Sequence, residues 1–204
     1  MITLRNITLR RGVKVVLQGA NLTLHPGEKV GLIGRNGAGK TRLLRILCGL
    51  SVASAGQVRW AGVPIQQSAE AYRAEMLYLG HTLSLKDDLS AVENLQFEAA
   101  VSGEPLDLPR ALAGLDRLGL RGREHLPLRV LSQGQKRRAA LARLLTSRAR
   151  LWLLDEPFVA LDPGAVTQLV DLLGQHVAQG GMVLYTSHQT VPMGGTGHHY
   201  RLSA

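Results

Sequence analysis

The chain has 204 residues, 45% of them hydrophobic, and a formal net charge of +9. A chain of this size buries a substantial core, either as one globular domain or as one domain with a small subdomain. No apolar run approaches the roughly 18 residues that a membrane-spanning helix needs, and the N-terminus lacks a charged-then-apolar signal pattern. We therefore expect a soluble protein on the cytoplasmic side. The single cysteine, Cys48, excludes an internal disulfide and is expected to be a buried structural thiol.

The first 24 residues have the pattern of β-strands. Apolar residues recur at short intervals from Ile2 to Leu24, and glycines stand at positions 12 and 19. We expect an antiparallel group of strands, interrupted at Gly12 and Gly19 and followed by a turn at 25–28.

A glycine-rich segment follows the apolar run Val30 to Ile33 and matches the phosphate-binding pattern G-x-x-x-x-G-K-[ST]. Its residues are Gly34, Arg35, Asn36, Gly37, Ala38, Gly39, Lys40 and Thr41. Glycines let the backbone fold around an anion, so that N–H groups and the N-terminus of the next helix face the phosphates. Lys40 would add positive charge at the β- and γ-phosphates, and the Thr41 hydroxyl would ligate Mg²⁺. The sequence predicts a nucleotide site here, and the antiparallel strands are a place where the base would be gripped.

Short strands are predicted on either side of a turn in the next segment. Gln57–Trp60 and Met76–Leu79 have the apolar pattern of strands, and Gly62 and Pro64 indicate a turn. We expect Trp60 to pack in the core or at a sheet edge rather than to contact a ligand.

Helical patterns dominate from about residue 84 to about residue 145. Ser90, with Glu93 three residues later, has the capping-box pattern of a helix start, and residues 108–118 repeat the helical pattern after Pro105. We expect a helical subdomain at about 84–145, inserted into a core formed by about 1–83 and 146–204. The predicted fold class is α/β, with an antiparallel β-subdomain and an inserted α-helical subdomain.

The second part of the core alternates strands with a helix. Leu151–Leu154 is predicted to be a buried parallel strand, Pro163–Gln179 an amphipathic helix and Met182–Thr186 the next strand. The glycine-rich tail from Val191 to Ala204 contributes at most one edge strand.

Two carboxylates, Asp155 and Glu156, end the first of these strands. The carboxyl ends of strands in such a sheet lie together, so Asp155 is expected beside the phosphate loop, where it would hold the Mg²⁺ shell. Glu156 is then placed to polarise water against a γ-phosphate.

Ten basic residues crowd one third of the chain and are opposed there mainly by Glu124. They are Arg117, Arg121, Arg123, Arg129, Lys136, Arg137, Arg138, Arg143, Arg148 and Arg150. Such a patch would face nucleic acid or anionic lipid headgroups, or form a solvated face that also helps to bind nucleotide. Scarce aromatic residues, not interleaved with the basic ones, argue against stacking on single strands.

The segment Leu131-Ser132-Gln133-Gly134-Gln135 lies between the phosphate loop and the acidic pair. Ser132 is placed to cap a helix, so that its hydroxyl, the Gly134 N–H and the helix dipole form a second anion site. The order and spacing of the phosphate loop, this signature segment, Asp155-Glu156, Ala160-Leu161-Asp162 and His188 resemble the ATP-binding-cassette (ABC) ATPases over essentially the whole chain.

This resemblance implies a P-loop NTPase cassette that hydrolyses Mg-ATP as a homodimer. The residues Ser132, Gln133, Gly134 and Gln135 would face the γ-phosphate bound by the other subunit. Asp162 would lie in the loop that crosses the dimer interface, and His188 would contact the γ-phosphate as a switch. Lys40, Glu156 and His188 are the catalytic residues that the resemblance implies, and Thr41 and Asp155 the metal ligands.

Three positions depart from the family pattern. His81 stands where the loop that couples to a membrane partner normally carries Gln; a neutral imidazole also bonds a metal-bound water, and the coupling then becomes pH-sensitive. Arg11 stands where an aromatic residue usually stacks on adenine, and a guanidinium stacks as well, with less base selectivity. Gln133 replaces the commoner glycine and is tolerable, because Ser132 and Gly134 carry the contacts.

Within the family, four segments most closely resemble the ATPase subunits of bacterial cytochrome c maturation systems. They are Leu79-Gly80-His81, Leu85-Lys86, Leu89 to Phe97 and Thr186 to Gln189, together with a short tail. The resemblance implies a peripheral protein on the cytoplasmic face of the inner membrane, bound to a polytopic permease, whose ATP turnover drives haem export or release of a haem-loaded chaperone.

Haem is expected to be handled by those partners, and His198 and His199 are expected in an exposed tail rather than as haem ligands. Nucleic acid is not an expected partner. Two alternatives stay open: the ATPase subunit of another ABC exporter, and a soluble nucleic-acid-associated ABC ATPase.

Overall fold

The computed structural model describes residues 1–35, 37–188 and 197–202, with the side chain of Arg11 outside the described part. The chain forms two units. The first comprises Met1–Tyr78, Ala149–Pro157 and Leu172–Ala204, and the second comprises Leu79–Arg148 and Phe158–Asp171.

An antiparallel sheet forms one side of the first unit. Its strands are β1 (Ile2–Arg11), β2 (Lys14–Leu24), β4 (Ala55–Trp60) and β5 (Val63–Pro64), in the order β2-β1-β4-β5. The turn between β1 and β2 contains Gly12, as predicted. The predicted interruption at Gly19 is wrong, because β2 runs through it: Gly19 has φ 61° beside a shift in the β1–β2 register, which indicates a bulge rather than a strand end. Pro64, predicted as part of a turn, lies in the edge strand β5.

A parallel sheet forms the other side of this unit. Its strands are β6 (Met76–Leu79), β7 (Leu151–Leu154), β8 (Met182–Ser187), β3 (Lys29–Ile33) and β9 (Gly197–Arg201), in the order β6-β7-β8-β3-β9. The predicted strands β6 and β7 are confirmed, and β8 extends one residue further than expected. Every residue of β7 and β8 is buried, which is why both appear in the sequence as apolar runs. The tail supplies the edge strand β9, as expected.

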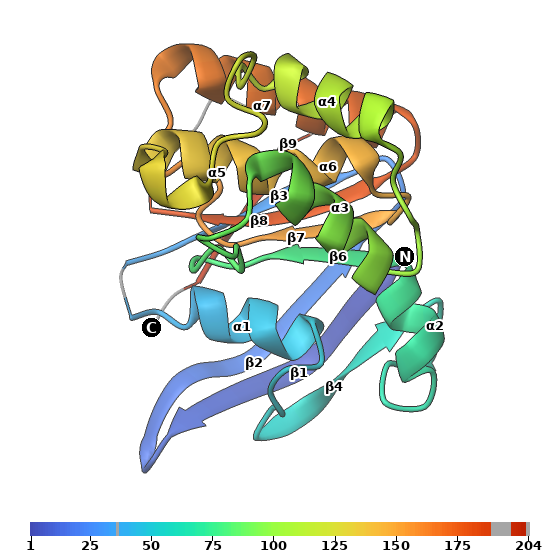
Figure 1. Cartoon of the computed structure of the whole chain (residues 1–204). Helices are drawn as coiled ribbons and strands as arrows, with labels where there is room; N and C mark the ends of the chain where they lie inside the picture. Colours follow the sequence, from blue (N-terminus) through green and yellow to red (C-terminus); the bar gives the residue numbers. More distant parts are fainter. Residues whose placement is uncertain (36, 189–196, 203–204) are drawn as a thin grey trace. The chain divides into compact units, whose positions relative to one another are not determined.

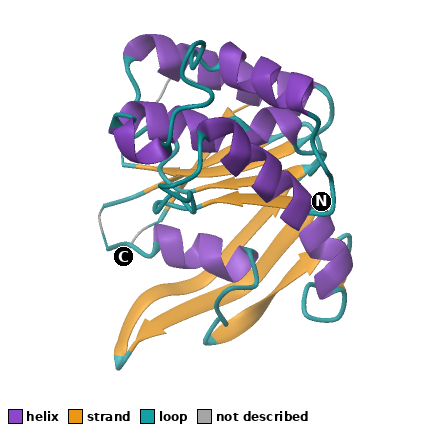
Figure 2. Cartoon of the chain, in the orientation of Figure 1, coloured by secondary structure: helices purple, strands orange, loops and turns teal. Residues whose placement is uncertain are grey.

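Helix α1 (Lys40–Leu47) lies between the two sheets (Figures 1 and 2). Its apolar face packs into a core with residues of both sheets, among them Leu4, Leu9, Val58, Leu32, Leu153 and Leu184. Cys48 follows the helix and is buried, and burial raises the pKa of its thiol to about 12, as expected for a structural cysteine.

The short helix α2 (Ala69–Ala74) was not predicted, and it explains the position of Trp60. Its Tyr72 is buried and donates a 2.6 Å hydrogen bond to the carbonyl of Leu47. The Trp60 ring packs against Tyr72 with centroids 5.6 Å apart, so the predicted packing role of Trp60 is confirmed.

The second unit is built mainly of helices. These are α3 (Ala91–Val101), α4 (Leu108–Arg117), the short η1 (Leu128–Val130), α5 (Gln133–Leu141), α6 (Arg143–Thr146) and the first part of α7 (Pro163–Ala178). The predicted capping box is present: Glu93 N–H donates to the Ser90 hydroxyl, and Ser90 N–H donates to the Glu93 carboxylate. None of the helices in the described part of the chain has the length and apolarity that crossing a membrane requires.

Candidate functional site

The phosphate loop joins the carboxyl end of β3 to α1. Gly39 is the N-cap of α1 and has φ 91°, a left-handed conformation that residues with a side chain rarely adopt. A Cβ on Gly39 would lie 3.1 Å from Val16 Cγ1, so the position lacks room as well. The loop therefore needs glycine here to turn its backbone into the N-terminus of α1, where anions bind. Asn36 lies outside the described residues.

The ammonium group of Lys40 contacts the backbone of this loop. Its Nζ donates to the carbonyl of Gly34 at 2.7 Å and to that of Arg35 at 3.5 Å. It also lies 3.8 Å from Oε1 of Glu156, and only 7% of the side chain is exposed. A single buried cation thus faces both the phosphate loop and the acidic end of β7.

Asp155 is fully buried at the end of β7 and lies beside the phosphate loop. Its Oδ1 accepts hydrogen bonds from the Thr41 hydroxyl at 3.1 Å and from the Thr186 hydroxyl at 2.6 Å. Parallel pairing of β3 with β8 and of β8 with β7 brings these three strand ends to one edge of the sheet. Oxygen ligands such as these suit a hard cation, and Mg²⁺ is commonly held by only one or two protein groups.

Glu156 has a backbone conformation that is uncommon for a residue with a side chain. Its φ is 50°, and its N–H donates to the Thr186 hydroxyl at 2.8 Å. Such left-handed residues cost about 1–3 kcal/mol and persist only where their surroundings fix them. Here the Thr186 bond helps to fix the backbone, and the Glu156 carboxylate lies between Lys40 and His188.

His188 follows β8 and contacts the same carboxylate. Its Nδ1 lies 3.1 Å from Oε2 of Glu156. About half of the His188 side chain is exposed, whereas only 15% of the Glu156 side chain is exposed. Within the first unit the structure therefore brings together Lys40, Thr41, Asp155, Glu156 and His188.

The signature segment and Asp162 lie in the second unit. Ser132 is the N-cap of α5: its hydroxyl accepts the Gln135 N–H, and Gln135 Oε1 accepts the Ser132 N–H. The predicted cap at Ser132 is confirmed. Asp162 precedes α7, and its Oδ1 accepts the N–H of Ala165 at 2.9 Å. Gln133 begins α5 and is exposed.

Two further residues, His81 and Arg11, were predicted at the metal and at the base. His81 is exposed in the loop that follows β6 and belongs to the second unit. Arg11 ends β1, but its side chain is outside the described part of the structure. The roles of His81 at the metal and of Arg11 at the base therefore stay predictions.

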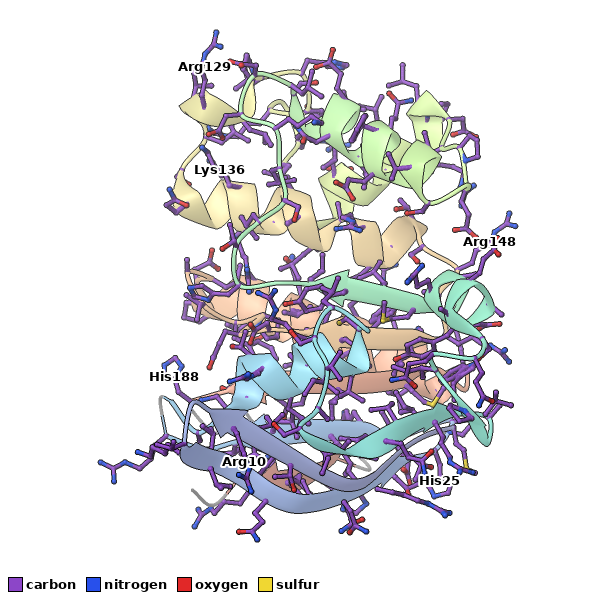
Figure 3. The ribbon with its side chains drawn as sticks, turned by 90° about the horizontal axis from the view of Figure 1, so that it is seen from below. Arg10, His25, Arg129, Lys136, Arg148 and His188 are labelled. Atoms are coloured by element: carbon purple, nitrogen blue, oxygen red, sulfur yellow. The ribbon has the colours of Figure 1, made fainter. Side chains whose placement is uncertain are left out.

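At least seven of the ten clustered basic residues form ion pairs with carboxylates, most of them distant in sequence. The pairs are Arg121–Asp116, Arg129–Asp88, Lys136–Asp87, Arg138–Asp162, Arg143–Glu98, Arg148–Glu104 and Arg150–Glu75. Figure 3 labels Arg129, Lys136 and Arg148. This pairing lowers the positive charge available to a phosphate backbone and favours the solvated-face interpretation over a nucleic-acid surface.

Two residues at these sites were not identified from the sequence. Thr186 bonds both Asp155 and the Glu156 backbone, and the only sequence signal for it is its place at the carboxyl end of a buried strand. Arg138 contacts Asp162 across 24 positions of sequence, and no local pattern predicts such a contact.

Comparisons with known proteins agree on one family. The ABC transporter family model matches residues 17–159. The cytochrome c biogenesis ATP-binding export protein CcmA of Nitrosomonas europaea is 47% identical over 204 residues, which cover all of this chain and 96% of that protein. CcmA of Methylococcus capsulatus is 48% identical over 185 residues, covering 91% of this chain and 89% of that protein.

Solved structures show the same fold. A putative ABC transporter ATP-binding protein of Pyrococcus furiosus superposes with a TM-score of 0.86 at 23% identity, covering 98% of this chain and 96% of that one. A dimeric ATP-binding cassette in a post-hydrolysis state, bound to ADP and Pi, superposes with a TM-score of 0.81 at 25% identity. The superposition covers 93% of this chain and 88% of that one. The predicted α/β P-loop cassette is confirmed, and the chain belongs to the ABC transporter family.

Proposed function

We propose that the chain is the ATP-hydrolysing subunit of an ABC exporter that serves cytochrome c biogenesis. The relatives that carry this function in their names align over nine-tenths or more of the chain, at 45–48% identity. One observation supports the ATPase activity in this proposal. Five side chains lie close together at one edge of the parallel sheet: Lys40, Thr41, Asp155, Glu156 and His188.

The nucleotide phosphates bind at the loop 34–41. Backbone N–H groups of the loop and the N-terminus of α1 supply a positive field for them. The Lys40 ammonium is already held at this loop by the Gly34 carbonyl, so it reaches a phosphate with little side-chain reorganisation. Its charge acts on the bound phosphates as well as on the transition state.

Thr41 and Asp155 are the residues that would hold Mg²⁺. Both offer oxygen, the ligand type that this ion prefers, and their oxygens lie 3.1 Å apart. When bound, the ion neutralises charge that develops on the phosphates. The Thr186 hydroxyl holds Asp155 Oδ1 at 2.6 Å and so keeps this carboxylate oriented toward Thr41.

Glu156 orients and deprotonates the attacking water. Its carboxylate is a proton acceptor within 3.8 Å of Lys40 and 3.1 Å of His188. A positioned base of this kind contributes about 10²- to 10⁴-fold in rate. His188 holds the second oxygen of Glu156 and, as the switch histidine, senses the γ-phosphate.

Each active site is completed by a second copy of the chain. Ser132 and Gly134, at the N-terminus of α5, supply an anion site for the γ-phosphate bound by the other subunit, and Asp162 lies in the loop that crosses the interface. One solved relative is dimeric with ADP and Pi bound, which supports this arrangement. Turnover per subunit should therefore fall as the protein is diluted into a monomeric range, and turnover that stays flat would contradict the dimer.

The homodimer works at the cytoplasmic face of the inner membrane, on a polytopic permease, and haem is handled by the partner proteins. Purification of the chain in mild detergent from its native membranes tests this role by identifying what accompanies it. A permease recovered with cytochrome c assembly proteins supports the proposal. A different permease would remove the haem role and keep the ATPase, whereas ribosomal or DNA-bound partners would remove the membrane role.

A further inference from the structure

Arg138 of α5 contacts the loop that carries Asp162. Its guanidinium Nη2 pairs with Oδ2 of Asp162, while the other oxygen of that carboxylate accepts the Ala165 N–H at 2.9 Å and so caps α7. The two oxygens of Asp162 thus have separate partners, one on α5 and one on α7. These two contacts lower the pKa of Asp162, the Ala165 hydrogen bond most strongly. The carboxylate is therefore held in its charged form between the two helices.

The rest of the Arg138 guanidinium is enclosed by the end of α4. Nη1 of Arg138 donates to the carbonyl of Leu118 at 3.4 Å. A Cβ on Gly119 would lie only 2.6 Å from the same Nη1. Gly119 therefore leaves the space that the guanidinium occupies. Only 22% of the Arg138 side chain is exposed, compared with 83% for Arg121, whose pair with Asp116 lies in the same unit. The Arg138 guanidinium is thus enclosed by its own unit, whereas 57% of the Asp162 side chain is exposed.

A second contact joins the same two elements one turn earlier in α5. A Cβ on Gly134 would lie 3.0 Å from the carbonyl oxygen of Ala160, so the start of α5 packs directly on the loop 158–162. Ala160 has φ 62°, a left-handed conformation that is uncommon for a residue with a side chain. Gly134 and Arg138 are four residues apart, on one face of α5, and both contact the loop.

We propose that Arg138 is a positioning residue for ATP turnover, which locks the loop 158–162 to α5 so that Asp162 and the signature segment keep one fixed geometry. This role rests on the proposed function, in which Ser132, Gly134 and Asp162 act on the nucleotide site of a second copy. Only Pro157 separates Glu156 from the loop 158–162 in the chain, so Arg138 also anchors the segment that follows the proposed base. Small errors in such geometry cost up to about 100-fold in rate.

The test compares Arg138→Gln with Arg121→Gln in the full chain, by ATP turnover at saturating ATP, the half-saturating ATP concentration and the melting temperature. Arg121→Gln removes an equal charge from an exposed pair and should keep wild-type turnover. Arg138→Gln should lower maximal turnover about 10- to 100-fold, with half-saturation within about threefold, because loop 34–41 is unchanged. Arg138→Lys keeps the charge without the planar fork and should give intermediate turnover.

A double-variant cycle with Asp162→Asn separates positioning from a general structural effect. The asparagine oxygen can still cap α7, so this variant loses mainly the partner of Arg138. Asp162→Asn should lose turnover to a similar extent, and the combined variant should lose no more than the worse single variant. Additive losses would show that the two residues act independently and would overturn the proposal, as would wild-type turnover in Arg138→Gln.

Two further results keep the test decisive. If Arg138→Gln does not fold, the turnover of Asp162→Asn becomes the test. Wild-type turnover in the Asp162→Asn variant would then overturn the proposal. If the wild-type chain itself shows no ATP turnover at concentrations that support a dimer, the proposed function fails instead of the role of Arg138.

Discussion

The Thr186 hydroxyl donates a 2.6 Å hydrogen bond to the buried Oδ1 of Asp155. The same hydroxyl oxygen accepts the N–H of Glu156 at 2.8 Å. One side chain of β8 therefore fixes both acidic residues at the end of β7: the carboxylate of the first and the left-handed backbone of the second. Thr186 is fully buried and contacts both the proposed metal ligand and the proposed base.

Thr186→Val should lower both stability and turnover. Valine has nearly the same shape but no hydroxyl, so both hydrogen bonds are lost at a buried site, which costs roughly 1–3 kcal/mol. Turnover should fall at least about tenfold, because Asp155 and Glu156 lose their orientation. Urea denaturation and an ATPase assay measure the two effects, and Thr186→Ser, which keeps the hydroxyl, is the matched control. A valine variant with serine-like turnover would contradict the orienting role.

Glu156→Gln should keep ATP binding and lose most turnover. The amide fills the same space between Lys40 and His188 but cannot accept the proton of water, so the rate should fall about 10²- to 10⁴-fold. With ATP bound and not hydrolysed, the variant should accumulate as a dimer, which size-exclusion chromatography with ATP detects. Glu70→Gln, on the exposed face of α2, is the control. Turnover near that of the control would remove Glu156 from the role of base.

The sequence predicted best those elements whose environment is uniform. Strands β7 and β8 are buried on both faces, so their apolar runs mark them clearly. The helix α2 and the two-residue β5 were missed because each is too short for a periodic pattern. Gly19 was misinterpreted because a left-handed glycine forms a bulge as readily as a strand end.

The position of Asp155 beside the phosphate loop followed from the sequence, because carboxyl ends of parallel strands share one edge of the sheet. Contacts between side chains that are distant in sequence could not be predicted from the sequence. The carboxylate of Glu75, for example, pairs with Arg150 through two hydrogen bonds across 75 positions of sequence. A count of charges in one third of the chain therefore overestimated the positive surface there.

His176 should make the chain less stable in mild acid. Its ring stacks on Trp152 with centroids 3.6 Å apart, and Nε2 lies 3.2 Å from the carbonyl of Arg150. Burial lowers the pKa of His176 below its ordinary value of 6.5, so the unfolded chain binds the proton first as the pH falls. The stability that neutral His176 contributes is therefore complete at pH values above the ordinary pKa of 6.5. It is lost progressively as the pH falls from 6.5 to the lower pKa of the folded state.

The variant His176→Phe tests this pH dependence. Phenylalanine keeps an aromatic ring against Trp152 but does not titrate, so its unfolding free energy should fall less than that of the wild type between about pH 7.5 and about pH 5.5. Urea denaturation at the two pH values gives the comparison. His25→Gln, at an exposed position, should keep the wild-type pH dependence. An equal loss in wild type and His176→Phe would assign the acid sensitivity to other groups.

Two glycine-to-alanine changes should have different effects on stability and turnover, although both glycines lie in helices. A Cβ on Gly174, in α7, meets nothing within 4 Å, so Gly174→Ala should stabilise the chain by roughly 0.4–1 kcal/mol through the entropy of the unfolded state and leave turnover unchanged. A Cβ on Gly134 would lie 3.0 Å from the Ala160 carbonyl, whose backbone is already left-handed and cannot shift freely. Gly134→Ala should therefore lower turnover by about tenfold or more and give less stabilisation than the change at Gly174. Thermal melts and ATPase assays on the two variants distinguish these effects. If Gly134→Ala stabilised the chain as much as Gly174→Ala and kept full turnover, the loop 158–162 would not be held tightly against α5.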